Sequence, residues 1–219
     1  MPRQREIIRG YVGPMFGKKT LLLLNDVFAA EAVGEEVLVF KPSVDVRYGQ
    51  SEIKSRAGGC HQAIAVNDSR EIVRVVERIE RKMRPNLVAI DEAQFFDPMI
   101  PEVVLYLSES GYQIVYSALN MNYRGEPFGP VRDLMPISTE LTMVTARCTY
   151  PTGNGGSRKC GAEAKYTQRL INGLAAPYES PEVVIDMPGK TEVRYEARCV
   201  DHWEVPGMPK RLAFLHKTG

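Results

Sequence analysis

The sequence predicts an α/β fold in which a parallel sheet is flanked by helices, followed by a small metal-binding module. Three observations lead to this prediction. Short apolar runs alternate with helical patterns through the first two thirds of the 219 residues, which is typical of parallel strand–helix–strand crossovers. One predicted strand-to-helix junction, residues 13–20, is close to a phosphate-binding loop (P-loop). Three of the four cysteines lie in the last third of the chain, where a histidine accompanies them.

The predicted elements follow from local patterns. Runs of mainly apolar residues predict strands at 7–12, 37–40, 63–66, 87–90 and 112–117. Apolar residues at helical spacing predict helices at 20–33, 69–83 and 101–110. The first helix is expected to bury Leu21 to Leu24, Val27, Phe28 and Ala30 and to end at Gly34. Asp68 or Ser69 is expected to cap the second helix.

The composition and pattern of the sequence change near residue 145. Short β-like runs such as Val183, Val184 and Ile185 are then interspersed with Pro and Gly. We therefore expect two domains, a nucleotide-binding domain over residues 1–144 and a metal-stapled module over residues 145–219.

Composition excludes several classes of protein. Lys and Arg total 28 against 27 Asp and Glu, giving a net charge of +1, which argues against a dedicated nucleic-acid binder. No stretch approaches the ~20 apolar residues of a membrane helix, and the first apolar run is too short for a signal-peptide core. We therefore expect a soluble, cytoplasmic protein with no membrane partner.

Residues 13–20 fit the P-loop pattern at three of its four fixed positions. Gly13, Lys19 and Thr20 are in register, but Lys18 occupies the position of the second glycine. Such a loop curls backbone N–H groups around phosphates, while its lysine contacts phosphate oxygens and its hydroxyl contacts Mg²⁺. The alternative is a Gly-Pro turn that caps a helix.

Two carboxylates follow a predicted strand of four apolar residues. Asp91 and Glu92 would therefore lie at the carboxyl edge of the sheet, where such folds bind ligands. An aspartate there can hold Mg²⁺, and its neighbour can accept a proton from an attacking hydroxyl. A solvated turn is the alternative, but the preceding P-loop favours a nucleotide site.

Four residues of the C-terminal module form a set that structural Zn²⁺ accepts readily: Cys148, Cys160, Cys199 and His202. The long spacing between the first two cysteines is not that of a zinc-ribbon knuckle. The alternative is that Cys148 is a buried apolar side chain and no metal binds. Cys60 and His61 lie outside this module and are expected to be structural.

Several sequence blocks, in order along nearly the whole chain, resemble the thymidine kinases of the small, zinc-containing type. The matching blocks are Gly13–Phe16, Asp45–Tyr48, Asp91–Phe96, Leu119–Phe128, Cys160–Gly161, Thr167–Leu170 and Tyr195–Cys199. The resemblance implies transfer of the γ-phosphate of ATP to the 5′-hydroxyl of thymidine. It also implies a lasso-like loop that covers the nucleoside, a structural Zn²⁺ and Mg²⁺ bound with ATP.

The resemblance assigns roles to individual residues. Glu92 would be the general base and Arg47 would stabilise the transferred phosphoryl group. The ATP and Mg²⁺ set would be Gly13, Pro14, Met15, Phe16, Gly17, Lys18, Lys19, Thr20, Asp45, Asp91 and Gln94. The thymidine set would be Met15, Phe95, Leu119, Phe128, Thr167, Val183, Val184, Ile185 and Tyr195. Core packing is the alternative for the three aromatic members, and we favour it for Phe128.

The sequence departs from the family pattern at four places: Lys18, Arg56 where the family often has His, Asn120 where Asp is common, and the long Cys148–Cys160 spacing. Lys18 motivates an alternative, a catalytically degenerate homologue that binds nucleotide or thymidine without useful turnover. A second alternative is a zinc-ribbon nucleic-acid module fused to an ATPase-like domain. The resemblance also suggests a homotetramer and feedback inhibition by dTTP.

Overall fold

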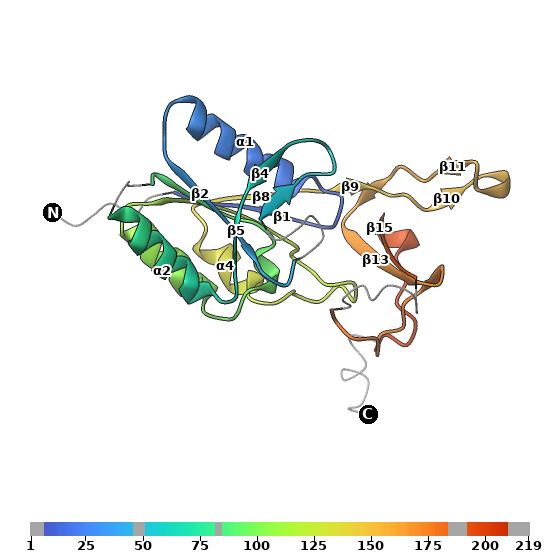
Figure 1. The fold of residues 1–219 in the computed structure, drawn as a ribbon. Coiled ribbons are helices and arrows are strands. Elements are labelled where there is room, and N and C mark those ends of the chain that lie inside the picture. Colours follow the sequence, from blue (N-terminus) through green and yellow to red (C-terminus); the bar gives the residue numbers. More distant parts are fainter. Residues whose placement is uncertain (1–6, 46–50, 82–84, 184–191, 210–219) are drawn as a thin grey trace. The chain divides into compact units, whose positions relative to one another are not determined.

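The computed structural model describes residues 7–45, 51–81, 85–183 and 192–209. The chain divides into two compact units, each considered by itself below (Figure 1). The first unit holds residues up to 120 together with 127–145. The second holds residues 121–126 and those from 146 onward.

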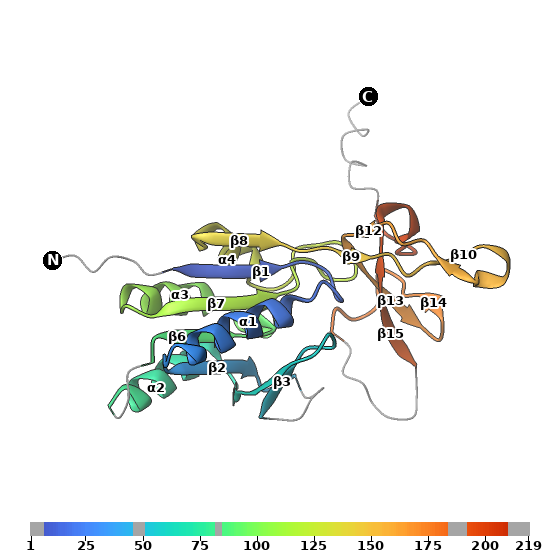
Figure 2. The same cartoon turned by 90° about the horizontal axis from the view of Figure 1, so that it is seen from above.

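The first unit is built on a parallel sheet, as predicted. Its described strands are β1 (Ile8–Val12), β2 (Val37–Pro42), β5 (Ile64–Val66), β6 (Leu87–Ile90), β7 (Gln113–Ala118) and β8 (Glu140–Met143). They form a six-stranded sheet in the order β5-β2-β6-β7-β1-β8, and every neighbouring pair is parallel (Figure 2). The carboxyl ends of β6, β7 and β1 therefore lie next to one another at one edge of the sheet.

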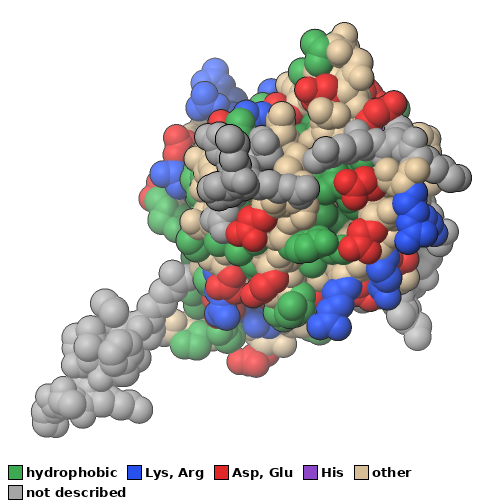
Figure 3. Space-filling view, turned by 90° about the vertical axis from the view of Figure 1, so that its left-hand side faces the viewer, with side chains coloured by type: hydrophobic (Ala, Val, Ile, Leu, Met, Phe, Trp, Pro, Cys, Tyr) green, Lys and Arg blue, Asp and Glu red, His purple; other side chains and the backbone are tan. Residues whose placement is uncertain are grey.

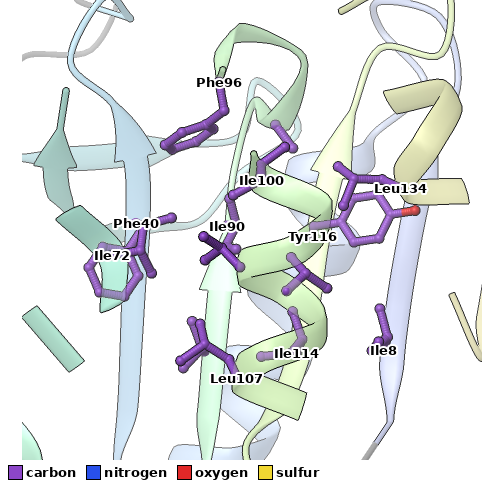
Figure 4. Close-up of a cluster of buried hydrophobic side chains, with 14 of the residues drawn as sticks. Ile8, Phe40, Ile72, Ile90, Phe96, Ile100, Leu107, Ile114, Tyr116 and Leu134 are labelled. Carbon is purple, nitrogen blue, oxygen red and sulfur yellow. The ribbon is translucent and has the colours of Figure 1, made fainter. Parts of the chain in front are cut away.

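Helices cover both faces of this sheet, with α1 on one face and α2 and α4 on the other (Figure 1). The bounds are α1 (Lys19–Ala32), α2 (Ser69–Glu80), α3 (Ile100–Glu109) and α4 (Val131–Ile137). Alternate strand residues enter opposite cores. Phe40, Ile90 and Ile114 pack with α2 and α3 (Figure 4), whereas Val39 and Val115 pack with α1. This two-sided burial explains why the strands read as continuous apolar runs.

The ends of α1 and α2 follow the predicted signals, but the predicted core of α1 is confirmed only in part: Leu23, Leu24 and Val27 are buried, whereas Leu21, Leu22 and Ala30 are half-buried. Gly34 has a φ of 83° just after α1, and the Asp68 carboxylate accepts a hydrogen bond of 2.8 Å from the Glu71 N–H. The prediction that Phe28 is a core residue was wrong. Its side chain is 39% exposed, because it lies on the outer side of α1, next to the ring of His61.

A second carboxylate also holds the start of α2. Asp97 accepts hydrogen bonds from the Ser69 N–H (2.7 Å) and hydroxyl (2.8 Å) and from the Met99 N–H (3.0 Å). Burial raises the pKa of Asp97, but these hydrogen bonds outweigh it, so the pKa lies below its ordinary value of 3.8.

Five described elements of the first unit were not predicted from the sequence, among them the three-residue helix η1 (Ala93–Phe95). The hairpin of β3 (Glu52–Lys54) and β4 (Cys60–Gln62) consists of two very short strands, and α4 is a short helix that contains Pro136. The edge strand β8 has four exposed residues and so lacks a buried pattern. None of the helices in the described residues is both long and apolar enough to cross a bilayer.

The second unit consists of small antiparallel sheets. A three-stranded sheet runs β14 (Leu174–Ala175), β13 (Tyr166–Ile171), β15 (Val193–Arg198). Two short hairpin-like pairs join β9 (Ala146–Arg147) to β12 (Glu163–Ala164), and β10 (Pro151–Thr152) to β11 (Arg158–Lys159). Val183 is exposed and outside any strand, whereas Val184 and Ile185 lie outside the described residues.

Candidate active site and metal centre

The site is built at the carboxyl edge of the sheet, where the chain leaves β1, β6 and β7. The residues that follow these strands are Gly13, Asp91 and Leu119. Because β7 pairs with both β1 and β6, the P-loop and the acidic pair start from the two strands that flank β7.

The P-loop is held in shape by contacts within itself and by one residue that the sequence did not point to. The buried Lys19 ammonium donates a 2.8 Å hydrogen bond to the Pro14 carbonyl, and Gly17 N–H donates to the same oxygen at 3.3 Å. A Cβ at Gly13 would lie 2.3 Å from the Val144 carbonyl, and one at Gly17 would lie 2.8 Å from Val144 Cγ2. Val144 therefore lies so close to the loop that only glycine fits at positions 13 and 17 without a shift of the backbone or of the Val144 side chain.

Lys18 lies at the N-cap of α1 in the left-handed region, with φ 62° and ψ 24°. This is the conformation that glycine adopts without cost and that side-chain-bearing residues adopt only with strain. Phe16 also has a positive φ, 67°, and its exposed ring lies under the Arg56 guanidinium at 4.8 Å. Two residues of this loop thus carry backbone strain.

A direct contact joins the P-loop to the acidic strand end. The Thr20 hydroxyl lies 3.2 Å from Asp91 Oδ1, and the Ser117 hydroxyl donates to the same oxygen. Asp91 is 4% exposed, so its carboxylate is oriented by two hydroxyl groups in a largely dry setting. A hydroxyl beside a buried carboxylate is the donor set that Mg²⁺ takes in P-loop proteins, and these residues fit that ion.

Glu92 and Gln94 occupy the turn after Asp91. Glu92 has a φ of 53° and caps the short helix η1 (Ala93–Phe95). The buried Gln94 amide donates to Glu92 Oε2, and its oxygen accepts a 2.9 Å hydrogen bond from the Leu119 N–H. Gln94 therefore orients the Glu92 carboxylate relative to the end of β7.

Of the other predicted phosphate contacts, the structure describes all but Arg47. Asp45 is buried and forms an ion pair of 3.4 Å with the buried Lys41 ammonium. Arg47 lies outside the described residues. Pro14 is buried with the loop and Met15 is half-buried.

The predicted thymidine contacts fall in both units. In the first, Phe95 and Phe128 meet edge to face at 5.5 Å, and Phe128 and Leu119 are buried. In the second, Thr167 is buried on β13, and Tyr195 on β15 is the register partner of Arg169. Arg169, which the sequence did not single out, is 2% exposed.

The four predicted metal ligands come together in the second unit. Their ligand atoms all lie within 4.8 Å of one another, with His202 Nδ1 at 3.2 Å from Cys199 Sγ and 3.7 Å from Cys148 Sγ. The His202 ring stacks on Tyr150 at 4.1 Å. Three sulfurs and one nitrogen at this separation fit a tetrahedral structural Zn²⁺.

Two cysteines of this cluster, Cys148 and Cys199, have opposite pKa shifts. Burial raises the pKa of Cys148, but hydrogen bonds with the backbone of Cys199 and Tyr150 and with His202 lower it to about 7. Burial raises the pKa of Cys199, and the neighbouring Cys148 thiol adds to this. The thiolate is the form that binds metal, and the lowered pKa of Cys148 makes its thiolate easier to form. Cys60, by contrast, is exposed, and its neighbour His61 contacts Glu31 at 2.9 Å.

Comparison with known proteins gives a consistent result. A family model described as thymidine kinase matches residues 6–203. A thymidine kinase of Ureaplasma urealyticum serovar 10 is 37% identical over 197 residues, which is 90% of this chain and 82% of the relative. Among solved structures, the X-ray structure of the Legionella pneumophila ATPase DotB is similar with a TM-score of 0.38 and 14% identity. That match covers 61% of this chain and 34% of the ATPase. The match to the family model over most of the chain shows that this protein belongs to the thymidine kinase family.

Proposed function

We propose that this thymidine kinase transfers the γ-phosphate of ATP to the 5′-hydroxyl of thymidine with Glu92 as general base. The observation that supports this most is the 3.2 Å contact between the Thr20 hydroxyl and the Asp91 carboxylate. It links the phosphate-binding loop to an acidic strand end, as phosphoryl transfer requires.

The phosphate side of the reaction is proposed to depend on the loop before α1. Its backbone N–H groups and the Lys19 ammonium would bind the phosphates, with Gly13, Pro14, Met15, Phe16, Gly17 and Lys18 shaping the loop. Mg²⁺, held by Thr20 and Asp91 when bound, would neutralise charge on the phosphate oxygens. Asp45 and Gln94 complete the proposed ATP and Mg²⁺ set, and Arg47 would stabilise negative charge in the transition state.

Glu92 is proposed to remove the proton from the thymidine hydroxyl. Glu92 directly follows Asp91, and its carboxylate accepts a hydrogen bond from the Gln94 amide. This hydrogen bond would hold the carboxylate in one orientation. Removing a base of this kind lowers the rate by about 10²-fold to 10⁴-fold.

The nucleoside is proposed to contact residues of each unit. Met15, Phe95 and Leu119 would serve in the first unit, with Phe128 supporting Phe95 from the core. Thr167, Val183 and Tyr195 would serve in the second, together with Val184 and Ile185. On this proposal residues 145–219 form the domain that covers thymidine.

The Cys148, Cys160, Cys199 and His202 cluster is proposed to hold one structural Zn²⁺ per chain. The small core around it contains only a few alanine and cysteine side chains, so a metal would supply stability that packing does not. We further propose a cytoplasmic homotetramer that dTTP inhibits.

A coupled assay with ATP, Mg²⁺ and each of the four deoxynucleosides tests this function. We expect turnover with thymidine to exceed that with deoxycytidine, deoxyadenosine and deoxyguanosine. Thymidine binding without turnover would support the degenerate alternative instead. The nucleic-acid alternative predicts salt-dependent binding to single-stranded DNA. On the face seen in Figure 3, basic side chains are interspersed with acidic ones, which does not favour it.

A further inference from the structure

The second unit contains a buried arginine whose guanidinium holds the main chain immediately before Val183. Arg169 Nη1 donates to the Pro181 carbonyl and Nη2 donates to the Glu182 carbonyl. Both residues lie in the segment 177–182, which follows β14. A planar guanidinium with two parallel donors fixes two successive carbonyls more firmly than a single ammonium could.

Aromatic rings hold this guanidinium in place. Its carbon lies 3.9 Å from the centroid of the Tyr123 ring and 5.4 Å from that of Tyr195, and the side chain is 2% exposed. Arg169 Nε is buried without a hydrogen-bond partner in the described residues. The guanidinium of Arg169 thus contacts two carbonyl oxygens and two aromatic rings. Its hydrogen-bond donors Nη1 and Nη2 point at the 177–182 segment.

A turn from residues 121–126 holds the same segment from a second direction. The Tyr123 hydroxyl lies 2.8 Å from the Ser180 carbonyl, and Arg124 donates to that carbonyl at 2.6 Å. The Asn122 amide donates to the Glu182 carboxylate at 2.7 Å. Side chains from two distant parts of the sequence thus converge on six consecutive residues.

We propose that Arg169, with Tyr123, is a positioning residue for thymidine. By fixing residues 177–182, it positions Val183, the next residue along the chain, for contact with the nucleoside. This inference rests on the proposed contact of Val183 with thymidine. Preorganising a loop in its binding conformation lowers the entropy cost of binding, so the effect should fall on thymidine rather than on ATP.

Steady-state kinetics of the full-length protein test the proposal. Arg169→Met removes both carbonyl contacts and should raise KM for thymidine about tenfold, with KM for ATP within about twofold. Arg169→Lys keeps the charge but not the paired donors and should give an intermediate KM. Tyr123→Phe, which removes only a hydroxyl, should raise KM for thymidine about threefold.

Arg198→Met is the matched control. Arg198 is also buried, at 5% exposed, and lies on the same three-stranded sheet, but it contacts Glu196 and Thr149 instead of the 177–182 segment. We expect this control to lower the unfolding temperature while KM for thymidine stays within about twofold. Equal rises in KM for both nucleotide and nucleoside in Arg169→Met would overturn the proposal.

Hydrogen exchange of the backbone amides of residues 178–180, 182 and 183 gives a readout that does not depend on catalysis. Measured without nucleoside, it should be at least about tenfold faster in Arg169→Met than in the wild type and the Arg198→Met control. Unchanged exchange would refute the positioning role. A wild-type protein without thymidine turnover would refute the proposed function, and the exchange result would then still decide whether Arg169 fixes this segment.

Discussion

Replacing Lys18 by glycine should stabilise the protein, because Lys18 has a left-handed backbone at the N-cap of α1. A side-chain-bearing residue in that region costs about 1–2 kcal/mol. Glycine would remove this strain, but it makes the unfolded chain more flexible, which lowers the free energy of unfolding by about 0.5–1 kcal/mol. The net gain expected for Lys18→Gly is therefore between about 0 and 1.5 kcal/mol and centres on about 0.75 kcal/mol, which corresponds to an increase of about 2–3 °C in the unfolding temperature.

Lys18→Ala is the control that separates backbone strain from side-chain charge. Alanine removes the ammonium but keeps the Cβ that makes φ 62° costly, so Lys18→Ala should show no comparable gain. Thermal and urea unfolding of the three proteins give the comparison. If the Gly and Ala variants unfold at the same midpoint, strain at residue 18 is refuted.

The same variants test whether Lys18 impairs catalysis. Lys18 has its strained backbone conformation in a loop that is already formed, in which Lys19 donates a hydrogen bond to the Pro14 carbonyl. The strain should therefore lower the free energy of unfolding by the same amount in the free and the ATP-bound protein. We expect kcat/KM for ATP to change by less than about threefold in Lys18→Gly. A rise of about tenfold or more would support the degenerate alternative.

The remaining predictions concern four other residues. Glu92→Gln should lower kcat by at least about 10²-fold at an unchanged unfolding temperature, and near-normal turnover would remove it from the base role. Cys160→Ser should lose the one zinc ion per chain that elemental analysis is expected to find in the wild type, and a metal-free wild type would contradict this. Gly13→Ala should abolish ATP binding in a nucleotide titration, because its Cβ would lie 2.3 Å from the Val144 carbonyl; normal affinity would show that the loop can shift. Asp97 has a pKa below 3.8 when folded, so its stabilisation is present above that pH and is lost as the pH falls through the folded pKa. Asp97→Asn should therefore be less stable at pH 7 by about 1 kcal/mol, with a difference that shrinks toward pH 2 in urea titrations, and a constant difference would argue against this linkage.

The centre of the sheet could be predicted because the strands β2, β6 and β7 are buried on both faces. A run such as residues 87–90 is apolar throughout, and only a helix-covered parallel strand requires that pattern. The edge strand β8 escaped prediction for the opposite reason, since all of its residues are exposed. Very short strands such as β3 and β4 carry too few residues for any periodicity to show.

The candidate site could be predicted where chemistry is local in sequence and not where it depends on packing. Residues 13–20 and the pair Asp91 and Glu92 are adjacent in the chain and carry a recognisable pattern. Val144 touches the P-loop only through the parallel pairing of β1 with β8, which no local pattern reveals. Arg169 likewise reads as an ordinary strand residue until its contacts with residues 181 and 182 are known.

The hairpin between Cys148 and Cys160 has a consequence for how such metal sites are recognised and engineered. The β10–β11 pair and its glycine-rich tip extend from a base that the two cysteines close, and the tip residues are exposed. Doubling the length of a flexible loop costs only about 0.6 kcal/mol, so ligand spacing is weakly constrained here and a search by fixed spacing overlooks sites of this kind. The exposed tip should accept an epitope tag or fluorophore between Gly155 and Gly156 without loss of the metal below it.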